Sequence, residues 1–158
     1  MIKIIAVGTI KETYLKEAIK DYSIRLQNYT TLKIISVSES RLVNKANESL
    51  INKSQNEEGI SLLKHVKTDD FIIALDAQGK SFSSIEFSDY LNNLFIRGKA
   101  NISILIGGSH GLSNIIKQKA DLLMSMSQFT FPHQLARLII LEQLYRAFKI
   151  LKNETYHK

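Results

Sequence analysis

The stretch Ile104-Leu-Ile-Gly-Gly-Ser-His-Gly-Leu112 passes without a break from an apolar segment into a turn rich in glycine. Turns of this kind at strand ends often bind phosphates. The dinucleotide fingerprint does not fit, because it needs Gly-x-Gly-x-x-Gly and an acidic residue about 20 positions later. At that distance the chain has Met126, Ser127 and Gln128. A Walker loop fails too, since no Gly-Lys-Ser/Thr follows, so the sequence argues against a phosphate cradle.

Two interpretations of these glycines stay open. Glycine permits tight turns with a positive φ, and it also leaves a bare backbone against which a flat ligand can lie. His110, in the same turn, is expected to face solvent.

Around this stretch, short apolar segments alternate with helical patterns. The segments that predict strands are 2–7, 32–37, 70–75, 101–106 and 121–126. Segment 70–75 is almost entirely apolar, as expected of a strand covered on both faces. The alternation predicts an α/β sandwich around a mostly parallel sheet. In such sheets ligands bind beyond the carboxyl ends of the strands.

The connections between these strands carry weaker signals. Residues 38–58 are polar and predict a loop that leads into the end of an amphipathic helix. Residues 76–80 are turn-like, and the Ser and Glu of segment 83–86 form a capping box that starts a helix. The only proline, Pro132, fits the first turn of a last helix that runs to about Leu151.

Composition bounds the class of protein. The chain of 158 residues suits one domain, 1–158, and its 44% hydrophobic content suits a globular core. Cysteine is absent, so there is no disulfide and no thiolate metal site. No apolar run approaches the ~20 residues that span a bilayer, so we expect a cytoplasmic protein with no membrane partner. The net charge of +6 favours a polyanionic partner.

The last helix is apolar on two sides. On a helical wheel, the second side is formed by Leu135, Leu138, Ile139 and Ile150. One side can cover the sheet of its own chain. The other indicates a second subunit, most simply across a twofold axis.

Polar residues at this end of the chain leave alternatives open. Glu142 and Arg146 stand four residues apart, which suits a surface ion pair or, for Arg146, a ligand to phosphate or to a base edge. His133 and Arg137 are expected to be packing and helix-end residues. The tail Tyr156-His157-Lys158 either frays or brings an aromatic ring, an imidazole and an ammonium to a site.

Five stretches form a recognisable set. They are IKIIAVGTIKETYLKEAI at 2–19, LDAQGKSFSS at 75–84, IGGSHGL at 106–112, FTFPHQLARLIILEQLYRAFKI at 129–150 and YHK at 156–158. Together they resemble, over the whole chain, the ribosomal RNA large subunit methyltransferase H family of the SPOUT class. The resemblance implies a homodimer with a trefoil knot in its C-terminal part, about 70–158. It also implies S-adenosyl-L-methionine as cofactor, without a metal.

The resemblance further implies which residues act. The implied cofactor contacts are Leu75, Gly107, Met126, Ser127, Gln128, Phe129, Thr130 and Phe131. If Gly107 is bare for the cofactor, Gly107→Val is predicted to block cofactor binding while the dimer stays folded.

The family methylates N3 of a pseudouridine in a helical hairpin of the 23S rRNA, within the assembled ribosome. The resemblance points to Glu142, Arg146, Tyr156 and His157 around the target base. N3 carries a proton at neutral pH. The hypothesis is that Arg146 positions or polarises the base while His157, or a water it holds, accepts that proton. The alternative function is a non-catalytic dimeric RNA- or ribosome-binding module of the same fold.

Overall fold

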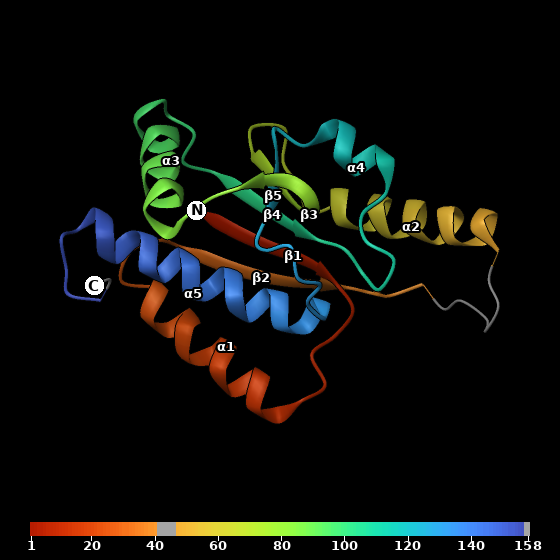
Figure 1. Cartoon of the computed structure of the whole chain (residues 1–158), viewed down its shortest axis with the longest axis horizontal. Helices are drawn as coiled ribbons and strands as arrows, with labels where there is room; N and C mark the ends of the chain where they lie inside the picture. The colour runs from red at the N-terminus through yellow and green to blue at the C-terminus, as the bar shows by residue number, and fades with distance from the viewer. Residues whose placement is uncertain (41–46, 157–158) are drawn as a thin grey trace.

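The computed structural model describes residues 1–40 and 47–156, and its architecture is an α/β sandwich (Figure 1). One sheet has the strand order β2-β1-β4-β3-β5, and every described pair in it is parallel. The strands are β1 (Ile2–Val7), β2 (Leu32–Val37), β3 (Phe71–Ser81), β4 (Ile102–Ile106) and β5 (Leu122–Ser125). The predicted fold class is confirmed.

Helices cover both faces of the sheet. They are α1 (Thr13–Leu26), α2 (Glu48–Leu63), α3 (Ser84–Ile96), α4 (Asn114–Lys119) and α5 (His133–Leu151). On one face α5 lies between α1 and α3, and on the other face lie α2 and α4 (Figure 1). Each face has its own hydrophobic core. In β1, Ile2 and Ile4 belong to the core beneath α1, α3 and α5, while Ile5 and Val7 belong to the core beneath α2 and α4. This double covering explains why the central strands are apolar on both sides.

Strand β3 runs further than the sequence predicted. Segment 76–80, expected to be a turn, continues the strand to Ser81 after a change of register between Leu75 and Lys80. Gly79 permits this, because a Cβ there would lie 2.5 Å from the backbone carbonyl carbon of Leu123. A larger side chain would force β3 and β5 apart, so a tertiary contact decided this segment against its turn propensity.

Helix α2 begins inside the segment that was expected to be a polar loop. The Asn47 side chain accepts a hydrogen bond of 2.9 Å from the N–H of Leu50 and caps the helix that starts at Glu48. The buried residues of α2 are Ser54, Glu58, Gly59 and Leu62, of which two are polar and only Leu62 is a large apolar residue. Its inner face therefore lacks the apolar periodicity that reveals a helix in the sequence. Residues 41–46 of the expected loop lie outside the described residues.

Other elements agree closely with the predictions. Ser83 accepts a hydrogen bond from the N–H of Glu86, whose carboxylate accepts one from the N–H of Ser83, so the capping box starts α3. Pro132 is the N-cap of α5 and does not enter its first turn, and α5 ends at Leu151 as predicted. Across residues 1–40 and 47–156, no helix has both the length and the apolarity to cross a membrane. The knot stays a prediction.

Candidate functional site

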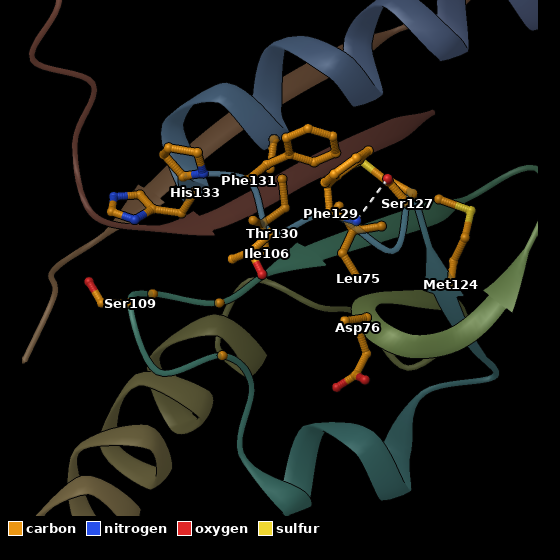
Figure 2. Close-up of a pocket in the computed structure, with 17 residues that line it drawn as sticks. Leu75, Asp76, Ile106, Ser109, Met124, Ser127, Phe129, Thr130, Phe131 and His133 are labelled. Atoms are coloured by element: carbon orange, nitrogen blue, oxygen red, sulfur yellow. Dashed lines mark hydrogen bonds between the residues drawn. The ribbon is translucent and has the colours of Figure 1, made fainter.

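A pocket of about 650 Å³ opens beside the carboxyl ends of β4 and β5 (Figure 2). Its lining comes from β3 at the register change, from the glycine turn after β4, and from the loop between β5 and α5. Parallel α/β sheets bind ligands at this edge, and the volume is ordinary for a small-molecule site. The pocket is therefore the candidate cofactor site.

Seven of the eight cofactor contacts that the resemblance implied line this pocket. They are Leu75, Gly107, Met126, Ser127, Phe129, Thr130 and Phe131. The eighth, Gln128, is exposed and is not a lining residue. Residues far apart in the sequence thus surround one cavity, while their contact with a cofactor stays a prediction.

Sequence reasoning missed several lining residues. Those that add polar or sulfur atoms are Asp76, Ser109, Met124 and His133. The Asp76 carboxylate forms an ion pair of 2.6 Å with Lys117 of α4, and Figure 2 shows it directed toward that helix. The only signal for these residues was their place near a strand end or at the start of α5, because their residue types are common on any surface.

The two ends of the pocket differ in polarity. Met124 and Phe129 lie at one end, and Ser109 and His133 lie at the other (Figure 2). The Ser109 hydroxyl donates a hydrogen bond of 2.8 Å to Oε1 of Glu39. Burial lowers the pKa of His133 below its ordinary value, and the nearby Glu39 carboxylate only partly opposes this. His133 is therefore neutral at neutral pH.

The glycine turn packs tightly against itself. Gly111 has a φ of +79°, which residues with a side chain rarely adopt. A Cβ on Gly107 would lie 2.6 Å from the carbonyl carbon of Gly111 and 2.9 Å from the backbone nitrogen of Leu112. The turn thus has a positive φ at Gly111 and a bare backbone at Gly107. The bare backbone at Gly107 is required by the close packing of the turn itself, before any ligand is considered. His110 is exposed, as expected.

Arg137 is more than the packing or helix-end residue that the sequence suggested. It is fully buried, and its guanidinium donates hydrogen bonds to the carbonyls of Val7 (2.6 Å) and Gly8. It also donates to the hydroxyl of Ser36 at 3.0 Å. These acceptors lie at the carboxyl ends of β1 and β2. Arg137 therefore joins the N-terminal part of α5 to both strands beside the polar end of the pocket.

A second cluster forms where α5 meets the C-terminal tail and α1. Glu142 Oε1 accepts a hydrogen bond of 3.0 Å from Arg146 Nε and another of 3.2 Å from the Tyr156 hydroxyl. The Arg146 guanidinium lies over the Tyr156 ring, 4.7 Å from its centroid. Tyr22 of α1, which sequence reasoning missed, places its hydroxyl 3.3 Å from that of Tyr156. His157, the remaining predicted catalytic residue, lies outside the described residues.

Protonation states in this second cluster follow from its contacts. The hydrogen bond to Glu142 raises the pKa of Arg146, which stays a cation. Burial, followed by the contact with Tyr22, raises the pKa of Tyr156 above its ordinary value. The phenol is thus protonated at neutral pH and can donate a hydrogen bond but cannot act as a base. The Glu142 and Arg146 side chains are only 20% and 26% exposed, so the pair is partly buried and not a simple surface ion pair.

The pocket and the second cluster lie toward opposite ends of α5. Ala136 is the last residue of α5 in the pocket lining, and Arg146 follows ten residues later. At a rise of 1.5 Å per residue, about 15 Å separates them along the helix axis. Reacting groups must approach to roughly 3–3.5 Å, so the side chains of the second cluster would have to cover most of this separation to reach a ligand in the pocket of the same chain.

Comparison with known proteins bears on the fold and the family. The sequence profile described as "Predicted SPOUT methyltransferase" matches residues 1–157. The chain belongs to the SPOUT methyltransferase family. Its pocket lies at the carboxyl edge of a parallel sheet, where proteins of this α/β architecture bind small ligands.

Relatives of this SPOUT methyltransferase share almost its whole length. A protein of Clostridium botulinum (strain Hall) named Ribosomal RNA large subunit methyltransferase H is 48% identical over 157 residues, which is 99% of either chain. A protein of the same name from Clostridium kluyveri is 45% identical over 157 residues, again 99% of either chain. The resemblance that the sequence motifs indicated is confirmed.

Two solved structures are similar to this SPOUT methyltransferase in fold. A probable methylase family protein from Haemophilus influenzae Rd KW20 has a TM-score of 0.57 at 17% identity, covering 99% of this chain and 70% of that one. A probable methyltransferase from Bordetella pertussis Tohama I has a TM-score of 0.53 at 11% identity, covering 92% and 95%. At such identities the likeness supports the fold alone.

Proposed function

We propose that this SPOUT methyltransferase transfers a methyl group from S-adenosyl-L-methionine to N3 of a pseudouridine in the 23S rRNA of the assembled ribosome. The observation that carries the proposal is the match, at 45–48% identity over 99% of the chain, to proteins named Ribosomal RNA large subunit methyltransferase H. The proposed place of action is the cytoplasm, where ribosomes are.

The pocket suits this cofactor in size and chemistry. S-adenosyl-L-methionine combines a flat adenine, a sulfonium that carries the transferable methyl group, and a charged amino-acid part. Apolar side chains such as Leu75 and Phe129 suit the flat ring, and backbone groups of the loop 126–131 suit its polar edge. Gly107 adds bare backbone to the wall. No metal takes part in the proposal.

The second cluster suits the target nucleotide. Glu142 orients Arg146, and the Tyr156 ring supports the guanidinium from one side. A cation fixed in this way can hold a phosphate or an acceptor on a base edge. Because Tyr156 stays protonated, the proton of N3 needs another acceptor. We assign that role to His157, whose imidazole is of a type that titrates near neutral pH.

We also propose a homodimer of single-domain chains (1–158), each with its knot in about 70–158. Within one chain, about 15 Å separates Ala136 in the pocket lining from Arg146 along α5, which favours a site that combines the pocket of one chain with Arg146 of the other. The second apolar side of α5 supports a twofold contact, because Leu135, Leu138, Ile139 and Ile150 all stay partly exposed. Phe129, at the pocket, is 81% exposed and is a further apolar side chain open to contact with a partner.

The proposed reaction is tested on ribosomes whose 23S rRNA lacks the methyl group. With radiolabelled S-adenosyl-L-methionine, we expect label at N3 of one pseudouridine in assembled ribosomes and far less in free rRNA. Mass spectrometry of nuclease fragments locates the label. No label, together with no saturable heat of cofactor binding, would support the non-catalytic RNA-binding module. Label at another nucleotide would overturn the target and keep the reaction class.

The shared active site is tested by mixing two inactive variants. Arg146→Met removes the cation, and Thr130→Trp fills the pocket. Each alone is expected to be inactive. If the pocket of one chain works with Arg146 of its partner, half of the randomly mixed dimers regain one of two sites, and activity returns to about one quarter of the unchanged protein. If each chain used its own Arg146, mixing and subunit exchange would restore nothing.

A further inference from the structure

One end of the cofactor pocket carries a carboxylate that the proposed reaction leaves without a role. Glu39 follows β2, and its Oε1 accepts the hydrogen bond from Ser109. Its Oε2 lies near Gly8, where a Cβ would be 3.7 Å from that oxygen and 3.0 Å from Nε2 of His133. Ser109 and His133 both line the pocket, and Glu39 is exposed. The carboxylate thus stands at the rim, between the two polar lining residues.

Two further carboxylates, those of Glu57 and Glu58, lie close to Glu39 because both bind Ser40, the next residue. Glu58 accepts a hydrogen bond of 2.9 Å from the N–H of Ser40, and Glu57 accepts one of 3.3 Å from its hydroxyl. Glu58 is buried, and burial raises its pKa. These groups give the region around the rim an acidic character that favours a cation over an anion.

The positive and titratable groups nearby do not cancel this character. Arg137 is buried beneath the rim, and its guanidinium donates hydrogen bonds to backbone carbonyls there. Lys11, in the loop between β1 and α1, lowers the pKa of His133 by its charge, but the opposite effect of the Glu39 carboxylate on that pKa is the larger of the two. His133 is neutral at neutral pH. The side chains that reach the pocket end are therefore a hydroxyl, a neutral imidazole and, behind them, a carboxylate.

We propose that Glu39, aimed by Ser109 and assisted by His133, holds the ammonium group of the amino-acid part of the methyl donor. The inference rests on the proposed function and assigns the orientation of the cofactor in the pocket. The end near Met124 and Phe129 suits adenine, so the amino-acid part extends to the opposite end, where Ser109 and His133 lie (Figure 2). Anchoring both ends fixes the sulfonium between them.

Calorimetry with two ligands that cannot donate a methyl group tests this assignment. S-adenosylhomocysteine keeps the amino-acid part, and 5′-methylthioadenosine lacks it. Glu39→Gln removes the charge and keeps the shape. Loss of the charged hydrogen bond is expected to lower the affinity for S-adenosylhomocysteine by about 10–100-fold. The affinity for 5′-methylthioadenosine is expected to fall by less than about 2-fold. The matched control is Glu57→Gln, which changes a neighbouring carboxylate outside the pocket and is expected to leave both affinities unchanged.

The outcomes separate this inference from the proposed function. Equal weakening of both ligands by Glu39→Gln would mean a structural role for Glu39 and overturn the inference, as would an unchanged affinity for S-adenosylhomocysteine. In either case the proposed function stands. If the unchanged protein bound neither ligand, the proposed function itself would fail. Circular dichroism melting of each variant shows that the fold is intact.

Discussion

Replacing Arg137 by methionine is expected to lower the free energy of unfolding by about 2–4 kcal/mol, because two buried carbonyls, those of Val7 and Gly8, lose their donor. Arg137 is fully buried, so water does not replace the guanidinium. Methionine keeps most of the apolar bulk, which limits the packing loss. Cofactor binding is expected to weaken too, because these carbonyls and Ser36 lie where β1 and β2 lead into the rim around Glu39.

Urea unfolding followed by circular dichroism measures this loss. The matched control is Arg25→Met, which removes an exposed ion pair with Asp21 on α1 and is expected to change stability by less than about 1 kcal/mol. Arg137→Lys keeps a charge and some donors, so its loss of stability is expected to lie between those of Arg137→Met and Arg25→Met. If Arg137→Met unfolded at the same urea concentration as the unchanged protein, the hydrogen bonds of Arg137 between α5 and the strands would not stabilise the fold.

Replacing Gly107 by alanine is expected to cost about 1–3 kcal/mol of stability and to abolish measurable cofactor binding. Its Cβ would meet backbone atoms of Gly111 and Leu112 at 2.6–2.9 Å, so the turn must move. Because the same turn walls the pocket, the movement disturbs the cavity as well. This changes the expectation for Gly107→Val, which on sequence grounds was to block the cofactor and spare the fold.

Thermal unfolding and calorimetry on the same samples separate the two effects. Gly98→Ala is the matched control: Gly98 has a φ of +76°, and a Cβ there meets no atom within 4 Å. It lies after α3, outside the pocket lining. Gly98→Ala is expected to cost stability through backbone strain, about 1–2 kcal/mol, and to leave cofactor binding intact. Full stability and full binding in Gly107→Ala would refute the close approach.

The sequence predicted much of the candidate site, for reasons that can be traced to particular residues. Leu75, Gly107 and the loop 126–131 come directly at or after apolar strands, and parallel topology places such positions on one edge. The resemblance then named them individually. Tyr22 and His133 were missed because a tyrosine in an amphipathic helix and a histidine after a proline have ordinary structural explanations. Glu39 was missed because it stands in a polar segment without periodicity.

By itself, the sequence determined the alternation of strands and helices and the family, and the resemblance to that family named seven of the residues that line the pocket. Those depend on local periodicity and on motifs that are contiguous in the chain. Only the tertiary structure decided that 76–80 is strand, that Arg137 is a buried joint, and that Gly107 serves its own turn. Each depends on backbone atoms brought close by residues distant in sequence or by a tight fold of the chain: Leu123 against Gly79, Val7 and Gly8 against Arg137, and Gly111 against Gly107. Local conformational propensity does not depend on such close approaches. Tertiary packing therefore determined the structure at these three places.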